Sequence, residues 1–161
     1  MDAGPDDVVS AVEQVYRESY RSFLRLAVGM LGDLDRGRDA VQETFARALR
    51  SAGDLRRIES LQPWLWRTLV NVCHVENRHS NVSLDGSYEP ASNGKPSDWS
   101  EVRELIASLP ERQRLVLFLR HYADLDYANI AEVVGIERGT VAATLHTAHQ
   151  KVREAMTEVR A

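Results

Sequence analysis

The stretch YANIAEVVGIERGTVAATL, residues 127–145, decides the fold of the C-terminal half of the chain. Apolar residues recur at helical spacing on both sides of Gly135, which predicts two helices joined by a tight turn. The small Ala131, four residues before the glycine, lets the second helix approach, and Val141, six residues after the glycine, packs back onto the first helix. A glycine at the turn suits a positive φ. This order of residues predicts a helix-turn-helix.

A helix-turn-helix reads DNA with the N-terminal end of its second helix, which enters the major groove. Gly139 or Thr140 would lie near the start of that recognition helix. From this pattern alone, a helical hairpin that does not bind DNA stays open as an alternative. We expect the small core of the motif to be completed by Ile130, Val134, Ile136 and Leu145.

The rest of the chain also has the apolar periodicity of helices, and no window alternates as a half-buried strand does. Residues 80–97 are rich in Ser, Asn, Gly and Pro and predict a flexible linker. The fold class is therefore all-α, with two small helical domains, residues 1–79 and 98–161, on either side of this linker. We expect a stop signal for the second helix at Gly53, an N-cap for the third at Ser60, and a capping box of Asp98 and Glu101 at the start of the fourth. The expected helices cover about residues 8–31, 35–53, 61–79, 98–109, 111–122, 126–134 and 138–159.

The charge balance limits what the chain can do by itself. The 161 residues include 20 basic and 24 acidic side chains, a net charge of −4, whereas a dedicated nucleic-acid binder is usually basic. Any DNA contact must therefore rest on local patches, or a protein partner supplies most of the affinity. No stretch is apolar enough to span a membrane and the N-terminus does not resemble a signal peptide, so we expect a cytoplasmic protein without membrane insertion.

Chemistry-bearing residues are sparse. Cys73 is the only cysteine, which excludes an internal disulfide, and its apolar neighbours predict a buried, inert thiol. His146 and His149 are three residues apart, but a metal site needs three or four converging ligands, so we interpret these and His121 as ordinary helical histidines. No nucleophile–base pair or Gly-rich phosphate loop is present. We expect no enzyme activity, no cofactor and no metal.

Three longer stretches resemble the extracytoplasmic-function (ECF) family of bacterial RNA polymerase sigma factors, and the resemblance covers about residues 20–156. FLRLAVGMLGDLDRGRDAVQETFARALR (23–50) and SLQPWLWRTLVN (60–71) are similar to sigma region 2. LPERQRLVLFLRHYADLDYANIAEVVGIERGTVAATLH (109–146) is similar to region 4. The most specific piece is DAVQETF (39–45), which has the wording of the family's helix that contacts core polymerase.

The resemblance implies a function for each half. Residues 1–79 would bind core RNA polymerase and the −10 promoter element, and residues 98–161 would read the −35 element. The protein would then direct polymerase to a small set of promoters, help to melt the −10 region and be held inactive by an anti-sigma protein. Its partners would be core RNA polymerase, promoter DNA and that anti-sigma protein.

Asp39, Gln42 and Glu43 are the candidate contacts to core polymerase. Their spacing places them on one helix face, which can dock on a basic or polar partner. A solvated face is the usual fate of such a triplet, but the surrounding DAVQETF favours the polymerase contact. On the opposite side of this helix we expect Val41, Phe45 and Leu49 to lie in the core.

The −10 candidates lie in the loop GDLRRIES and in the helix after it. Arg56 and Arg57 can attract a single DNA strand or stack on its bases, although two solvated arginines are an equal alternative. Trp64 and Trp66 point to different helix faces, one into the core and one toward the melting site; the resemblance favours Trp64 as the core member. The full set that we retain for −10 binding is Arg56, Arg57, Trp64, Arg67, Asn71 and Arg78.

Both DNA-facing helices are less basic than is usual in the family. The recognition helix has no Lys or Arg between Arg138 and Lys151. Neutral or acidic residues stand where basic or other polar residues are common, namely Val70, Val75 and Glu76 in the −10 helix and Ala142, Thr144, Thr147 and His149 in the −35 helix. The remaining −35 candidates are Arg138, Thr140, Ala143, Thr144, Thr147 and Lys151.

Several explanations compete for this loss of charge, because each missing phosphate contact weakens binding to DNA. Core polymerase can supply most of the promoter affinity, which we favour. The promoter can be unusual, with Ala142 or Ala143 contacting thymine methyl groups. The chain can also be a sigma-like adaptor that no longer reads DNA. A helix-turn-helix regulator that binds its operator as a dimer without polymerase is the alternative from another class.

Overall fold

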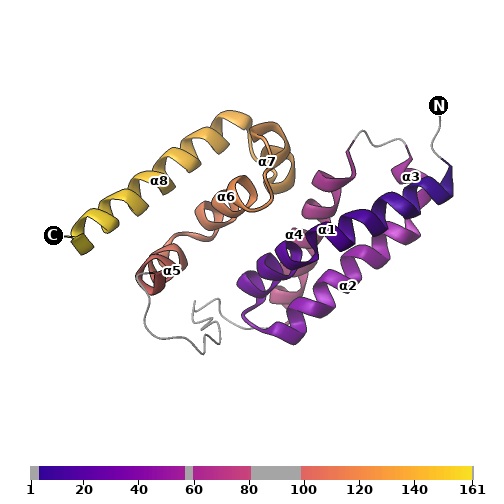
Figure 1. Cartoon of the computed structure of the whole chain (residues 1–161), viewed down its shortest axis with the longest axis horizontal. Coiled ribbons are helices and arrows are strands. Elements are labelled where there is room, and N and C mark those ends of the chain that lie inside the picture. Colours follow the sequence, from indigo (N-terminus) through magenta and orange to yellow (C-terminus); the bar gives the residue numbers. More distant parts are fainter. Residues whose placement is uncertain (1–3, 57–59, 81–98, 161) are drawn as a thin grey trace. The chain divides into compact units, whose positions relative to one another are not determined.

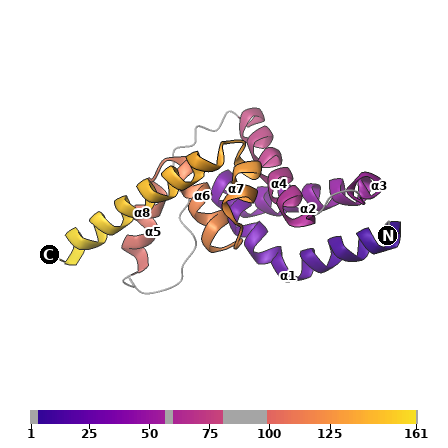
Figure 2. The same cartoon turned by 90° about the horizontal axis from the view of Figure 1, so that it is seen from above.

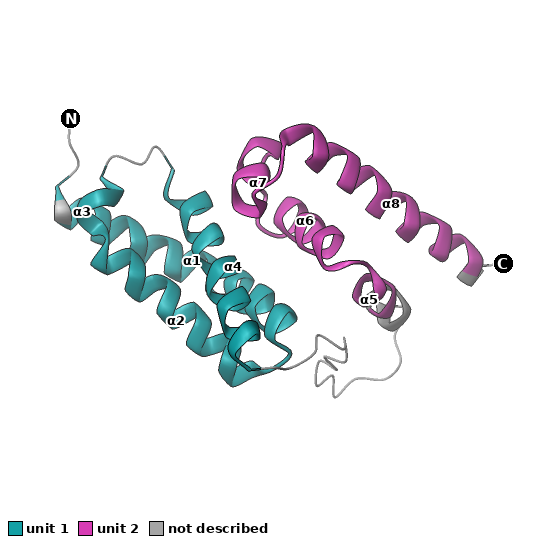
Figure 3. Ribbon diagram, turned by 180° about the vertical axis from the view of Figure 1, so that it is seen from behind, with its two compact units in different colours: residues 1–84 teal, residues 85–161 magenta. Residues whose placement is uncertain are grey.

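The computed structural model describes residues 4–56, 60–80 and 99–160. The chain divides into two compact units, residues 1–84 and 85–161 (Figure 3). All regular structure in the described residues is helical, which confirms the all-α fold class. The division falls inside the predicted linker, of which residues 81–97 lie outside the described part, as does Asp98 of the predicted capping box.

The first unit is a bundle in which α1 (Pro5–Leu31), α2 (Leu34–Arg50) and α4 (Leu61–His79) pack against one another (Figure 1). Gly32 ends α1 in the left-handed region, with φ of 70°. The carboxylate of Asp33 then accepts a hydrogen bond from the Arg36 amide at 2.8 Å and begins α2, since an N-cap carboxylate satisfies an otherwise unpaired amide. Ser60 is the N-cap residue of α4, but its side chain makes no capping hydrogen bond.

Two details of this unit differ from the sequence-based expectation. The chain does not stop being helical at Gly53, because Ala52–Leu55 forms a short helix, α3, whose Leu55 is buried against the bundle. The prediction that Leu49 lies in the core was wrong, because its side chain is 49% exposed. Ala48 takes the core position, and the next residue is turned by roughly 100° about the helix axis.

Aromatic rings form the centre of the first unit. Phe23 of α1 stacks on Trp66 of α4 with ring centroids 3.8 Å apart, and Phe45 of α2 meets Phe23 edge-on at 5.3 Å. Trp66 is 1% exposed, whereas Trp64 is half-buried, so the expectation that Trp64 is the core member was wrong. Trp66 shares the i, i+3, i+7 stripe of the buried Leu69 and Cys73, and that periodicity decides which ring is inside.

A close crossing of α1 and α2 depends on Gly37. A Cβ atom at this position would lie 2.6 Å from Cγ2 of Val28 and 3.2 Å from its backbone nitrogen. Only a residue without a side chain lets the two helices approach this closely without a shift of one of them.

The second unit contains α5 (Trp99–Ser108), α6 (Glu111–His121), α7 (Tyr127–Val134) and α8 (Arg138–Arg160). The long α8 packs against α5, α6 and α7 (Figure 2). Its buried residues are Val141, Leu145 and Ala148, which recur at helical spacing along one stripe.

The turn between α7 and α8 has the predicted helix-turn-helix geometry. Gly135 has φ of 73°, and its N–H donates to the Ala131 carbonyl at 2.9 Å. Ile130 is fully buried as predicted, but Val134 and Ile136 are only half-buried. Val133 is buried instead, because it lies three residues after Ile130 on the face that α8 covers. Of the described helices, none is long and apolar enough to cross a membrane.

Candidate nucleic-acid and partner interfaces

The −10 candidates on α4 form a single stripe. Trp64, Arg67, Asn71 and Arg78 are separated by three, four and seven residues, so they share one helix face. Arg67, Asn71 and Arg78 are exposed, and Trp64 is half-buried at the edge of the core. The structure therefore brings these four residues together. Arg56, the C-cap residue of α3, is exposed, and Arg57 lies outside the described residues.

Sequence reasoning missed His74 as a member of this α4 stripe. It is exposed and lies three residues after Asn71 and four before Arg78. The spacing alone was the signal, since positions at three and four residues on a helix are neighbours on its surface. A histidine there adds a ring that can stack on a base and two nitrogen atoms that can form hydrogen bonds.

The arginines of the α4 stripe differ from Arg47 and Arg50 of α2 in whether they form ion pairs. Within the described part of the chain, neither Arg67 nor Arg78 makes an ion pair. Arg47 and Arg50 of α2, by contrast, both bind the Glu43 carboxylate, at 2.7 and 3.1 Å. The α4 stripe therefore presents two cations that form no ion pair with an acidic residue of the described ranges.

The candidate partner face on α2 is of mixed charge rather than acidic. Asp39 and Gln42 are exposed, but Glu43 is half-buried and its Oε1 accepts the hydrogen bonds from Arg47 and Arg50. The Arg47 hydrogen bond is the largest cause that lowers the pKa of the Glu43 carboxyl, so this side chain stays ionised. A partner therefore meets a fixed carboxylate–guanidinium network beside the freely exposed Asp39.

The −35 candidates on α8 occupy its outer flank. Thr140, Ala143, Thr147 and Lys151 are exposed and follow one stripe, and Arg138 is exposed at the first turn. Thr144 is half-buried, and its hydroxyl donates to the Thr140 carbonyl at 2.7 Å. The Thr144 proton is therefore already used inside the helix.

Basic residues occur only at the two ends of this helical segment, and Arg138, two residues before Thr140, lies on a different side of α8 from the stripe that ends in Lys151. Arg138 and Lys151 make no ion pair with the residues that the structure describes. The thirteen residue steps from Arg138 to Lys151 span about 20 Å of helix at roughly 1.5 Å per step. Two available cations thus border an uncharged middle section.

A pair of histidines joins α6 to α8. Nε2 of His121 lies 2.9 Å from Nε2 of His149, a distance that requires one ring to donate and the other to accept. Burial is the largest cause that lowers the pKa of His149, followed by the neighbouring His121. No group of three metal-ligating side chains occurs in residues 4–56, 60–80 and 99–160. The pair therefore acts as a hydrogen-bonded contact between helices.

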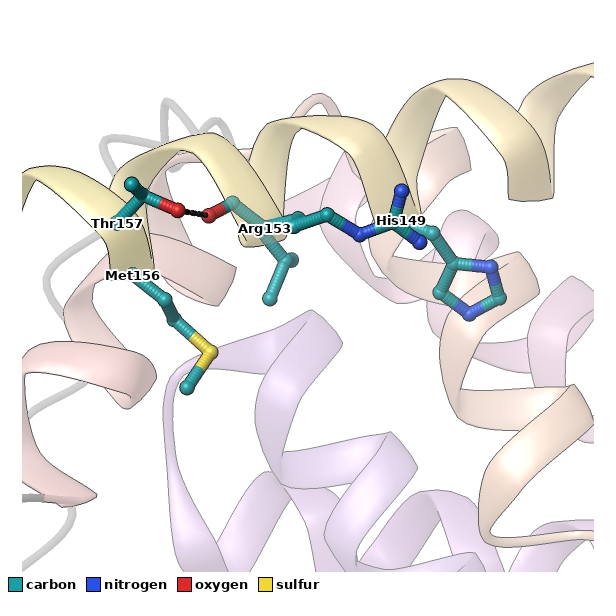
Figure 4. Close-up of a pocket in the computed structure, with 5 residues that line it drawn as sticks. His149, Arg153, Met156 and Thr157 are labelled. Atoms are coloured by element: carbon teal, nitrogen blue, oxygen red, sulfur yellow. Dashed lines mark hydrogen bonds between the residues drawn. The ribbon is translucent and has the colours of Figure 1, made fainter.

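Two further features have no evident part in these surfaces. Cys73 is buried, as expected, and burial raises the pKa of its thiol to about 12, which favours the protonated form. An open hollow follows the later turns of α8 and is lined by His149, Val152, Arg153, Met156 and Thr157 (Figure 4). The Thr157 hydroxyl in this hollow donates to the Arg153 carbonyl at 2.9 Å.

Comparison with protein families matches both units. Residues 15–79 match the model of sigma-70 region 2, and residues 99–152 match that of sigma-70 region 4. The chain is 25% identical over 163 residues to the RNA polymerase sigma factor YlaC of Bacillus subtilis (strain 168), covering 93% of this chain and 94% of that protein. It is 29% identical over 155 residues to the ECF RNA polymerase sigma factor EcfG of Rhodopseudomonas palustris (strain TIE-1), covering 91% and 81%.

A solved structure has the same fold. The sigma factor RpoE of Bartonella quintana, in a co-crystal with the anti-sigma factor NepR, superposes with a TM-score of 0.72 at 19% identity, covering 90% of this chain and 96% of that one. The two family models together account for most of the chain, in the order expected for a two-domain sigma factor. The chain therefore belongs to the sigma-70 family of RNA polymerase sigma factors, within its ECF group.

Proposed function

We propose that this protein is an alternative sigma factor that binds core RNA polymerase in the cytoplasm and directs it to specific promoters, without catalytic chemistry of its own. Residues 1–79 bind the polymerase and the −10 element, and residues 98–161 read the −35 element. The observation that carries this proposal is the α4 stripe, where exposed Arg67 and Arg78 have no acidic partner among the described residues.

At the −10 element, the α4 stripe is suited to a separated DNA strand. Arg67 and Arg78 attract phosphates, while Trp64 and His74 offer rings on which bases can stack. Asn71, between them, has both a donor and an acceptor for a base edge. Arg56 at the end of α3 adds a further cation. This combination of cations and rings is typical of surfaces that bind single strands.

At the −35 element, the distribution of charge on α8 fits a helix inserted into the major groove. That groove is roughly 12 Å wide, so a helical segment of about 20 Å places its ends near the two sugar–phosphate backbones. Arg138 and Lys151 stand at those ends, and the uncharged Thr140, Ala143 and Thr147 face the bases. The phosphates are thus contacted from the borders of the segment, and the middle reads base edges and thymine methyl groups.

Few phosphate contacts mean that α8 binds weakly by itself. The remaining affinity comes from core polymerase, held by Asp39, Gln42 and the Glu43–Arg47–Arg50 network on α2. The relative RpoE was solved with an anti-sigma factor, and we propose that an anti-sigma protein also holds this chain inactive.

Binding of a fluorescent promoter fragment, with and without core polymerase, tests this proposal against the alternatives. A sigma factor binds the fragment tightly only as holoenzyme. Tight binding by the protein alone, as a dimer, would identify a helix-turn-helix regulator, and core binding without any gain of DNA affinity would identify an adaptor.

The polymerase contact has a matched control on the same helix. Asp39→Ala removes an exposed carboxylate from the proposed contact, whereas Asp35→Ala removes one that pairs only with Arg38 at 3.6 Å. We expect Asp39→Ala to weaken core binding roughly tenfold and Asp35→Ala to change it by less than about twofold. Equal effects would contradict the assigned face.

A further inference from the structure

Arg36 occupies a position that its own helix does not favour. It is the third residue of α2, in the first turn, where the positive end of the helix dipole attracts acidic side chains and repels cations. After an N-cap such as Asp33, Glu or Gln at this position would complete a capping box. Interactions outside α2 must therefore account for an arginine at this position.

The reason lies at the C-terminal ends of two other helices. Arg36 Nη1 donates to the carbonyl of Leu31, the last residue of α1, at 3.1 Å. Its Nη2 donates to Ser80 Oγ at 3.0 Å and lies 3.4 Å from the carbonyl of Glu76 in the last turn of α4. Both helix ends carry partial negative charge, and α1 has no basic residue in its last turn.

A second hydrogen bond joins the C-terminal ends of α1 and α4, this time with a donor on α4. Asn77 of α4 donates from Nδ2 to the carbonyl of Met30 in α1 at 2.9 Å. Arg36, Asn77 and Ser80 form a helix-end clasp, in which side chains of α2 and α4 donate to the last two carbonyls of α1 and Arg36 also bonds to Ser80 at the end of α4. The clasp closes the bundle at the end of α4 where the described part of the first unit stops.

We propose that Arg36 is a positioning residue for promoter opening, because it fixes the last turn of α4 and thereby the place of Arg78 on the −10 stripe. Arg78 lies between Asn77 and Ser80, so the clasp holds the backbone on both sides of it. The inference rests on the proposed role of the α4 stripe in binding the −10 strand. A loose last turn would leave Arg67 in place and displace Arg78.

The test compares Arg36→Gln with Arg38→Gln. Arg38 is two residues away on α2, loses the same charge, and among the described residues forms an ion pair only with the exposed Asp35. Hydrogen exchange of residues 74–80 reports on the clasp, and permanganate reactivity of −10 thymines, with holoenzyme on a promoter that the wild type opens, reports on function. We expect Arg36→Gln to accelerate the exchange and to reduce opening roughly five- to tenfold, as for loss of one or two hydrogen bonds from a charged group.

Two further variants separate positioning from general loss of structure. Arg36→Lys keeps the charge and reaches one acceptor, so it should recover part of the opening. In an Arg78→Gln background, Arg36→Gln should cost little more, because both changes act on one contact. If Arg36→Gln does not fold, Ser80→Ala removes a single exposed hydroxyl of the clasp and should accelerate the same exchange.

The outcomes distinguish this inference from the proposed function. Normal core binding with slower opening for Arg36→Gln, and wild-type behaviour for Arg38→Gln, supports the positioning role. Equal opening by the two variants, additive losses with Arg78→Gln, or a loss of core binding would overturn the positioning role and leave the sigma function standing. If wild-type holoenzyme opened no promoter at all, the proposed function would fail, and the positioning role with it.

Discussion

The two proposed DNA-reading helices, α4 and α8, are supported in different ways. The back of α4 is set in an aromatic core through Trp66, and its C-terminal end is tied by Arg36 and Asn77. The buried stripe of α8 consists of the smaller Val141, Leu145 and Ala148. The stripe on α4 includes Arg67 and Arg78, whereas the proposed DNA-reading segment of α8 has basic residues only at its ends.

This difference fits the two separate DNA-binding roles that we propose for α4 and α8. A helix that must hold a separated strand needs a rigid support and charges directed at a flexible phosphate chain. A helix that reads an intact duplex can rely on the regular shape of the groove, with few charges, when a large partner supplies affinity. We therefore expect the two helices to differ in how substitutions change the stability of their units and the salt dependence of promoter binding.

The largest expected effect is on the core behind α4. Trp66→Ala removes a fully buried ring and its stack on Phe23, so it should lower the free energy of unfolding of the first unit by about 3–5 kcal/mol. Trp64→Ala, at the half-buried neighbour, should cost much less stability but should reduce promoter opening. Urea denaturation of both variants measures the difference, and equal losses would contradict the assignment of Trp66 to the core.

The next effect concerns the turn that places α8. Gly135→Ala should destabilise the second unit by about 1–2 kcal/mol, because a Cβ at φ of 73° is strained even though it meets no neighbouring atom. Gly139→Ala is the control, since this helical position has equal space and no positive φ. It should stabilise the unit by roughly 0.5–1 kcal/mol. Thermal unfolding that ranks the two variants the other way would refute the turn geometry.

Salt dependence tests the uncharged section of α8 directly. Thr147→Arg places a cation on the exposed stripe between Arg138 and Lys151 and should strengthen holoenzyme binding to the promoter. The slope of log affinity against log salt should steepen by about 0.9, the value for one added phosphate contact. Glu132→Arg is exposed on α7 and adds charge away from this stripe. An identical slope change for both variants would mean that α8 has no specific place in the groove.

The smallest effect is the pH dependence of the contact between α6 and α8. The pKa of His149 is lowered in the folded protein, so the unfolded chain binds its proton first as the pH falls. The stability contribution is therefore present above the ordinary pKa of about 6.5 and declines as the pH falls through and below that value. His149→Gln should flatten this decline, and His146→Gln should flatten it much less, because His146 is the smallest cause of the lowered pKa. Thermal melting at pH values above and below the ordinary pKa tests the prediction, and a decline unchanged in His149→Gln would argue against the pair.

Helical periodicity was enough to predict the all-α fold, the helix-turn-helix and most helix ends. The prediction of buried residues failed where neighbouring apolar residues compete for the same core position. Ala48 and Leu49, and Val133 and Val134, differ by one position, and only packing selects the buried member. For the two tryptophans, the stripe of Leu69 and Cys73 already indicated Trp66, and the family resemblance that favoured Trp64 was misleading. The stripe on α4 could be anticipated from spacing, although His74 was overlooked.

Other features depend on contacts that no local pattern indicates. The Arg36 clasp joins residues more than forty positions apart, since Arg36 donates to Ser80. The pairing of His121 with His149 likewise needs the folded α6 and α8. Glu43, Arg47 and Arg50 are spaced so that their side chains can meet on one helix face. Whether they form ion pairs with one another or face a partner depends on the side-chain rotamers in the folded unit.

The most direct test of the central claim is transcription by purified core polymerase with this protein on a fragmented genomic library, with the 5′ ends of the transcripts sequenced. We expect discrete start sites that share −35 and −10 elements and that disappear with Arg67→Ala together with Arg78→Ala. Measurable binding to core polymerase without any discrete transcript would contradict this function, and would show that a chain with an uncharged middle section in α8 acts as an adaptor.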